Sequence, residues 1–113
     1  MRILVNGEPR GTIDAEDRGL QYGDGLFETM SVANGRLRFL DWHLERLAEG
    51  ARRLGFPVLD IDGIRGELGQ ATTGATAVVK LLLTRGSGPR GYRPPIEPKP
   101  TRIVMAIDGR PAV

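Results

Sequence analysis

Residues 26–40 read LFETMSVANGRLRFL, and this stretch is the most informative part of the sequence for predicting the fold. Residues 26–33 are rich in strand-forming side chains. Asn34 and Gly35 both tolerate a positive φ, so together they are a strong signal for a two-residue hairpin turn. Residues 36–40 are then the expected returning strand, and the stretch as a whole predicts an antiparallel hairpin.

The first strand of this hairpin is expected to bury one face. Leu26, Met30 and Val32 share that face because successive side chains of a strand point to opposite sides, and Glu28 interrupts it. Residues 12–25 are glycine-rich and are expected to be irregular. Short apolar runs predict three further strands, at residues 2–6, 77–85 and 101–107.

Two helices are expected between the strands. Asp41 can cap a helix over residues 42–54, whose apolar side chains repeat at helical spacing. A second helix is predicted over residues 61–71, although Gly63 and Gly66 weaken the helical propensity. The acidic residues around it are explained better as its cap and polar face than as a carboxylate cluster, and they are Asp60, Asp62 and Glu67.

These elements predict an α+β domain, an antiparallel sheet with two helices packed on one face. A chain of 113 residues suits one domain with a real core. We expect this domain to span residues 1–107. Residues 108–113 are then the start of a linker to a further domain that is absent from this chain.

Composition narrows the function classes. The net charge of +2 is too small to imply a polyanionic partner, so no nucleic acid is expected. Without cysteine the chain has no disulfide, thiolate nucleophile or cysteine-based metal site. The single histidine, His43, excludes a histidine cluster for a metal ion. The apolar run at residues 1–5 is too short for a signal peptide or membrane span, so a cytoplasmic protein without a membrane partner is expected.

Two loops that contain several glycines lie beside apolar strands, at residues 18–29 and 85–92. Both loops carry arginine and tyrosine. Glycine lets the backbone approach a ligand closely. Arginine offers a fork of donors that matches a carboxylate or a phosphate. The loops therefore suggest a pocket for a small anionic molecule.

Four segments follow one another in a characteristic order and spacing. They are Asp17-Arg18-Gly19-Leu20 with Tyr22-Gly23-Asp24-Gly25-Leu26-Phe27-Glu28, the Asn34-Gly35 turn, His43-Leu44-Glu45-Arg46-Leu47, and Arg85-Gly86-Ser87-Gly88-Pro89-Arg90-Gly91-Tyr92. The pattern resembles the class IV aminotransferase family of pyridoxal-phosphate enzymes, and within it most resembles the aminodeoxychorismate lyases. Each segment alone is a weak signal, but four in register are a strong one.

The resemblance implies a fold and a cofactor. Family members join an N-terminal α+β domain to a larger C-terminal domain, hold pyridoxal 5'-phosphate between the two, and form homodimers. The chain is similar to the N-terminal domain of these fold-type IV enzymes only. The Schiff-base lysine of the family lies in the C-terminal domain, so no catalytic residue is assigned here and we expect this chain alone to be inactive.

The resemblance also assigns binding residues. It places Arg46 on the cofactor phosphate, and a charge-assisted pair of that kind is chemically sensible. It places Arg90 and Tyr92 on the carboxylate of a small amino-acid-like substrate, partly across the dimer interface. Tyr22 is expected to line the substrate side of the pocket. No metal-binding residue is expected.

Three other residues could be mistaken for catalytic groups. His43 is expected to be structural, packed near the start of the first helix. Lys80 interrupts an apolar strand, but alternation places it on the wetter face of the sheet, opposite Val79 and Leu81. Lys99 lies between prolines in a surface loop.

Three functions remain open from sequence. The resemblance favours a lyase that converts 4-amino-4-deoxychorismate to 4-aminobenzoate and pyruvate, a step in folate synthesis. An aminotransferase for branched-chain or D-amino acids, from the same family, is the first alternative. The second is a non-catalytic anion-binding or nucleic-acid-binding module built on Arg85, Arg90 and Arg93 with Tyr92.

Overall fold

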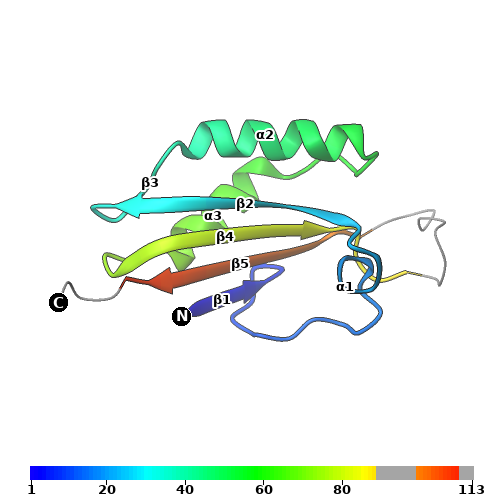
Figure 1. Cartoon of the computed structure of the whole chain (residues 1–113), viewed down its shortest axis with the longest axis horizontal. Helices are drawn as coiled ribbons and strands as arrows, with labels where there is room; N and C mark the ends of the chain where they lie inside the picture. Colours follow the sequence, from blue (N-terminus) through cyan, green and yellow to red (C-terminus); the bar gives the residue numbers. More distant parts are fainter. Residues whose placement is uncertain (89–98, 110–113) are drawn as a thin grey trace.

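A single antiparallel sheet with two long helices on one face forms the domain, which confirms the predicted α+β class (Figure 1). The computed structural model describes residues 1–88 and 99–109. The elements are β1 (Arg2–Val5), α1 (Arg18–Tyr22), β2 (Gly25–Ala33), β3 (Arg36–Leu37), α2 (Leu40–Arg53), α3 (Ile61–Ala71), β4 (Thr76–Thr84) and β5 (Thr101–Asp108).

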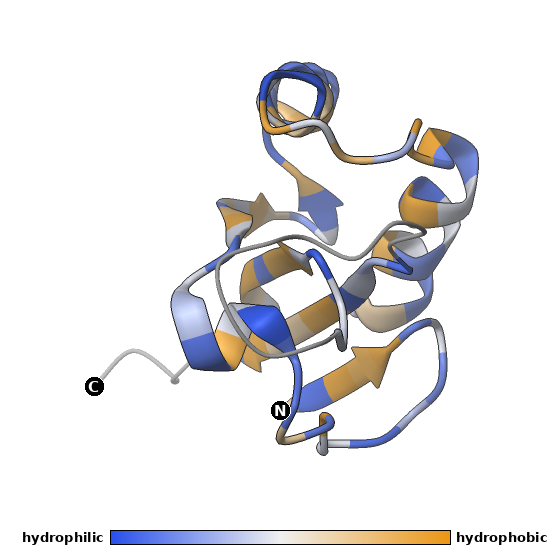
Figure 2. Ribbon diagram, turned by 90° about the vertical axis from the view of Figure 1, so that its right-hand side faces the viewer, coloured by the Kyte–Doolittle hydropathy of each residue, from blue (hydrophilic) through white to orange (hydrophobic). Residues whose placement is uncertain are grey.

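The strands lie in the order β1-β5-β4-β2-β3, and all neighbours are antiparallel. Helix α2 lies over β2, and α3 lies over β5 and β1. Figure 2 shows both helices on the same side of the sheet, and the buried apolar residues of both belong to the core. No helix among the described residues is both long and apolar enough to cross a membrane.

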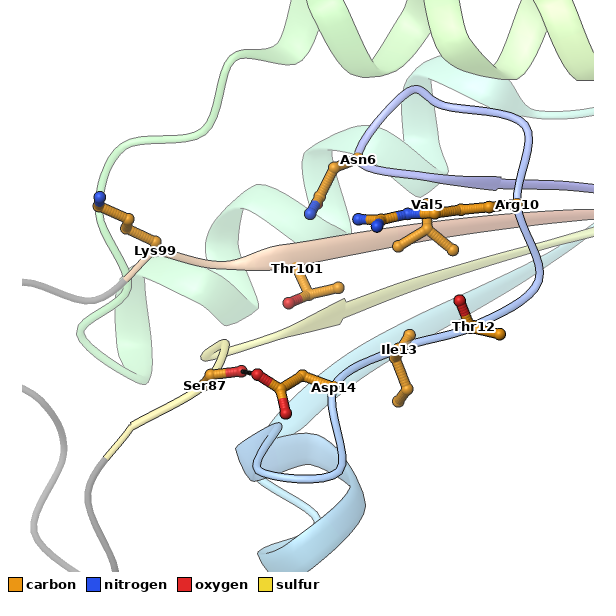
Figure 3. A pocket seen from close by; sticks show the side chains of 9 residues that line it. All are labelled: Val5, Asn6, Arg10, Thr12, Ile13, Asp14, Ser87, Lys99 and Thr101. Carbon is orange, nitrogen blue, oxygen red and sulfur yellow. Dashed lines mark hydrogen bonds between the residues drawn. The ribbon is translucent and has the colours of Figure 1, made fainter.

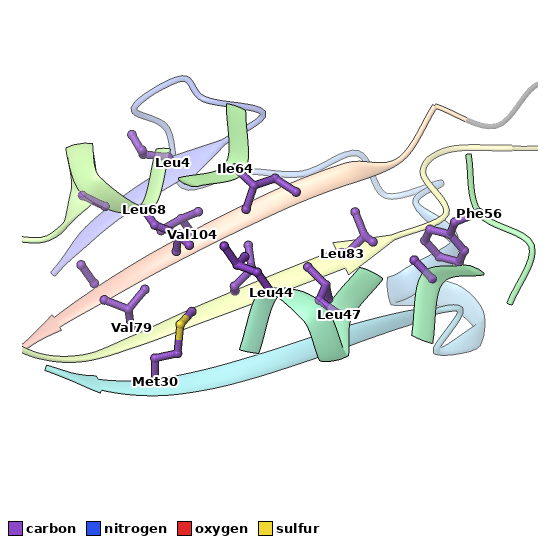
Figure 4. Packing of buried hydrophobic residues seen from close by; sticks show 14 residues of the cluster. Leu4, Met30, Leu44, Leu47, Phe56, Ile64, Leu68, Val79, Leu83 and Val104 are labelled. Carbon is purple, nitrogen blue, oxygen red and sulfur yellow. The ribbon is translucent and has the colours of Figure 1, made fainter. Parts of the chain in front are cut away.

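The core fills the space between the helices and the sheet (Figure 4). Alternate residues of the central strands enter it, as period-two alternation predicts. They are Met30, Val79, Leu81, Leu83, Val104 and Ala106, each at most 1% exposed. The helices contribute Leu44, Leu47, Ala51, Ile64, Leu68 and Ala71. Lys80 lies on the opposite face of β4, as predicted, with its ammonium nitrogen 5.5 Å from the centre of the Phe27 ring.

The returning strand of the hairpin is shorter than predicted. The Asn34-Gly35 turn forms, but β3 ends at Leu37 and α2 begins at Leu40. Phe39 takes a left-handed conformation, with φ of 55°, and turns the chain from the sheet edge onto the sheet face. Asp41 therefore does not cap α2. It lies in the first turn, where a carboxylate still interacts favourably with the helix dipole.

Residues 12–25 contain a helix that the sequence analysis did not predict. Helix α1 has only five residues. The carboxylate of Asp17 caps it by accepting from the Gly19 amide at 2.8 Å, and Gly23 ends it with a left-handed φ of 66°. Because the segment is so short, it has no apolar periodicity that could have revealed it.

Helix α3 has the predicted bounds and the predicted cap. Asp60 accepts from the Gly63 amide at 3.0 Å. A side chain at Gly63 would collide with that carboxylate, which explains the glycine in the first turn. Glu67 is not in a carboxylate cluster, since it binds Arg102 of β5 at 2.6 Å and ties the helix to the sheet.

Candidate functional site

The site begins with a carboxylate on the core-facing side of β2. Glu28 lies between Leu26 and Met30 on that face, and its side chain is only 6% exposed. His43 Nδ1 lies 2.7 Å from Glu28 Oε1. Arg46 Nε lies 3.3 Å from Oε2. Each carboxylate oxygen thus has a partner from α2, which compensates for much of the cost of burying the charge.

The guanidinium of Arg46 extends from this buried pair toward solvent. Its side chain is 64% exposed, and the guanidinium carbon lies 5.4 Å from the centre of the Trp42 ring. Arg46 borders a pocket of about 480 Å³ between β2 and α2. The pocket is lined by Gly25, Leu26, Phe27, Glu28, Arg46, Leu47, Glu49, Gly50 and Arg53.

This pocket lies at an open strand edge. β3 pairs only with Val32 and Ala33, so among the described residues the outer edge of β2 before these positions has no strand partner. Gly50 lies one turn after Arg46 and keeps α2 close to the sheet, because a Cβ there would lie 3.3 Å from a Leu26 methyl group. Backbone groups, a cation and apolar side chains therefore converge on one pocket.

The far end of the pocket carries a fixed anion. Glu49 accepts from Arg52 at 2.8 Å and from Arg53 at 3.0 Å. The hydrogen bonds from Arg52 and then Arg53 lower the pKa of Glu49 to about 2. Glu49 is therefore ionised at neutral pH, and its charge is directed at these two arginines rather than at Arg46.

Arg18 and Arg85, the arginines of the two glycine loops that the structure describes, are structural. Arg18 and Arg85 are buried and donate through Nε to the same oxygen of Asp24, at 3.0 and 2.8 Å. Burial opposes ionisation of Asp24, but the hydrogen bonds from Arg85 and Arg18 outweigh it and hold its pKa below the ordinary value. Arg85 also donates to the carbonyl of Leu54 at 2.8 Å and is therefore not displayed for nucleic acid.

The predicted site residues are only partly brought together. Arg46 lies at the pocket. Tyr22 does not line it and lies on α1, with its ring 4.7 Å below the guanidinium carbon of Arg18. Arg90 and Tyr92 fall outside the described residues. Their assignment, and that of Tyr22, stays a prediction.

A separate polar pocket lies near Thr101, the first residue of β5 (Figure 3). The hydroxyl of Ser87 donates to Asp14 at 3.0 Å there. The Lys99 side chain points away from that pair and is exposed, which agrees with its predicted surface position.

Glu28 and His43 each stand out in the sequence, but nothing in the sequence connects them. The signal was the interruption of an apolar strand face by a carboxylate, followed by a histidine and an arginine one helical turn apart. Their pairing is long-range, since Glu28 and His43 are 15 residues apart.

Comparisons with known proteins identify the family of this chain. A family model described as amino-transferase class IV matches residues 25–112. The crystal structure of 4-amino-4-deoxychorismate lyase from Pseudomonas aeruginosa superposes with a TM-score of 0.82 at 46% identity, over 98% of this chain and 41% of that one.

Two curated relatives are similar over most of this chain. Aminodeoxychorismate lyase of Vibrio harveyi is 35% identical over 91 residues, which cover 80% of this chain and 34% of its own length. D-alanine aminotransferase of Bacillus licheniformis is 33% identical over 101 residues, which cover 82% of this chain and 36% of its own length. The chain thus spans little more than a third of these relatives, and it belongs to the class IV amino-transferase family, whose members depend on pyridoxal phosphate.

Proposed function

We propose that this chain is the N-terminal part of a pyridoxal-phosphate-dependent lyase that forms 4-aminobenzoate and pyruvate from 4-amino-4-deoxychorismate. The observation that carries the proposal is the 46% identity to the Pseudomonas lyase across nearly the whole chain. The likeness to a D-alanine aminotransferase supports a second candidate, a transaminase, because the two curated relatives differ by only two percentage points in identity, 35% against 33%.

Two features of the β2–α2 pocket support the proposal that it receives the phosphate group of the cofactor. Arg46 supplies an accessible guanidinium, which can bind two phosphate oxygens at once. The pocket lies at a strand edge of β2 that has no strand partner among the described residues, so an anion can reach it. Arg53 also lines the pocket, with its charge paired to Glu49. The cofactor, held there, would supply an electron-accepting ring.

The chain's own residues then have binding roles only. In this proposal Arg46 anchors the phosphate. Arg90 and Tyr92 hold a substrate carboxylate, and Tyr22 faces the substrate. Neither Lys80 nor Lys99 is assigned to the cofactor, since Lys80 lies on the other face of the sheet and Lys99 is exposed in a loop.

The test uses the complete protein with 4-amino-4-deoxychorismate and no keto acid. The proposal predicts equal amounts of 4-aminobenzoate and pyruvate, measured by chromatography. A parallel reaction supplies D-alanine or a branched-chain amino acid with 2-oxoglutarate, and is assayed for glutamate. Glutamate formation without 4-aminobenzoate would contradict the lyase and support the transaminase.

A further inference from the structure

We propose that Glu28 is a positioning residue that orients the Arg46 guanidinium for phosphate, with His43 fixing the carboxylate in turn. The proposal rests on the assignment of Arg46 to the cofactor phosphate. It adds a role for two residues, one on β2 and one on α2, that do not themselves touch the anion.

The geometry provides a chain of contacts from the core to the pocket. His43 Nδ1 holds Oε1 of Glu28 at 2.7 Å, and Oε2 faces Arg46 Nε at 3.3 Å. His43 and Arg46 are three residues apart on α2, so both reach the same carboxylate from one side of the helix. With both oxygens engaged, the carboxylate has a defined plane and direction.

The Arg46 guanidinium approaches Glu28 through Nε. A guanidinium held at that edge can present its terminal amino groups together, in the fork that matches a phosphate. Trp42 lies against the guanidinium at 5.4 Å and limits its rotation further. An arginine side chain otherwise loses considerable rotamer freedom on binding, so orientation in advance strengthens the binding of an anion.

Stability alone gives a weak reason for a carboxylate at this position. Neighbours on the same strand face, Leu26 and Met30, are apolar, and an apolar side chain in place of a buried ion pair is often neutral or stabilising. The Arg46 partner is largely exposed, which further limits what the pair contributes to folding. Orientation of Arg46 accounts for a buried carboxylate that faces an accessible cation.

Charge alone and orientation predict opposite changes in phosphate affinity when Glu28 is neutralised. The direction of the change therefore tests the proposal. A carboxylate 3.3 Å from the guanidinium offsets part of its positive charge, so its neutralisation would strengthen phosphate binding if charge alone mattered. If Glu28 orients Arg46, the same change weakens binding. Glu49 is the matched control because it lines the same pocket but pairs with Arg52 and Arg53.

The experiment measures equilibrium binding to the complete protein, freed of its cofactor. Pyridoxal 5'-phosphate, pyridoxal and inorganic phosphate are each titrated into wild type, Glu28→Gln, Glu49→Gln, Arg46→Ala and the double variant Glu28→Gln/Arg46→Ala. We expect Glu28→Gln to weaken pyridoxal phosphate and phosphate by about threefold to tenfold, the value of one ordinary hydrogen bond. Pyridoxal should bind unchanged, and Glu49→Gln should leave binding equal or tighter.

The double variant separates orientation from general damage. If Glu28 acts through Arg46, Glu28→Gln has no further effect once Arg46 is alanine. Equal or tighter phosphate binding by Glu28→Gln would overturn the proposal, as would a loss that persists in the double variant or extends to pyridoxal. Failure of the underlying assignment gives a different result, since Arg46→Ala would then bind pyridoxal phosphate as wild type does.

Discussion

Asp24 offers a sharp test of what holds the first glycine loop to the sheet. Arg85 Nε donates to its Oδ2 at 2.8 Å and Arg18 Nε donates to the same oxygen at 3.0 Å. The side chains of these arginines are only 8% and 4% exposed. The substitution Asp24→Asn keeps the shape of the side chain but removes the charge that both guanidinium groups share.

The expected loss of stability follows from these contacts. Breaking a buried ion pair costs about 3–5 kcal/mol, and a single hydrogen bond to a charged group contributes about 1.5–3 kcal/mol. Asp24 is 18% exposed, and Arg85 keeps its hydrogen bond to the Leu54 carbonyl in the variant. The loss of folding free energy should therefore lie toward the lower end of these ranges. We expect a decrease of about 2–3 kcal/mol in the free energy of unfolding, and a midpoint lower by roughly 10 °C.

The effect should depend on pH in a defined direction. The pKa of Asp24 is lowered in the folded chain, because the bonds from Arg85 and Arg18 outweigh desolvation. Such a carboxyl stabilises the folded state above its unfolded pKa, near 3.8, and the contribution is lost as pH falls through the lower folded value. The difference in free energy of unfolding between wild type and Asp24→Asn should therefore be largest at neutral pH and decrease in acid.

Urea unfolding followed by circular dichroism at neutral and acidic pH measures both effects. Asp41→Asn is the matched control, since Asp41 pairs with Arg65 at 2.8 Å but is 79% exposed. Its loss should stay within about 0.5–1 kcal/mol. The reasoning is refuted if Asp24→Asn unfolds like Asp41→Asn at neutral pH, or if its deficit is the same at both pH values.

Three further outcomes follow from the fold. A methyl group at Gly66 would meet open space, so Gly66→Ala should stabilise the folded chain by up to about 1 kcal/mol. A methyl group at Gly63 would collide with the Asp60 carboxylate that caps the helix, so Gly63→Ala should give no such gain or should destabilise the chain. Urea titrations of both variants measure the difference. Gly86→Ala should cost about 2 kcal/mol or more, because φ is 89° and a Cβ would collide with a backbone carbonyl; unchanged unfolding would contradict this. This chain alone, supplied with pyridoxal phosphate and 4-amino-4-deoxychorismate, should form no 4-aminobenzoate, and turnover that disappears in Arg46→Ala would contradict that expectation.

Local patterns in the sequence predicted most of the fold. The Asn34-Gly35 turn and the Asp60 cap involve neighbouring residues, so residue type alone indicated them. Strand alternation correctly separated Val79 and Leu81 from Lys80. The turn at Phe39 was missed because an aromatic residue rarely takes a left-handed conformation.

The candidate site could be predicted only in part. Its main contact joins Glu28 of β2 to His43 of α2, which are 15 residues apart, and the pair that buries Arg85 joins it to Asp24, 61 residues away. The sequence therefore did not distinguish Arg85, which is buried, from Arg46, which is accessible. The assignments of Arg90 and Tyr92, and the homodimer, stay predictions.

A crystal structure of the complete protein with pyridoxal phosphate tests the central claim most directly. We predict the Arg46 terminal amino groups within about 2.7–2.9 Å of phosphate oxygens, the distance of a charge-assisted hydrogen bond, with Glu28 still behind Nε. A phosphate bound elsewhere, with Arg46 in contact with solvent alone, would contradict the account.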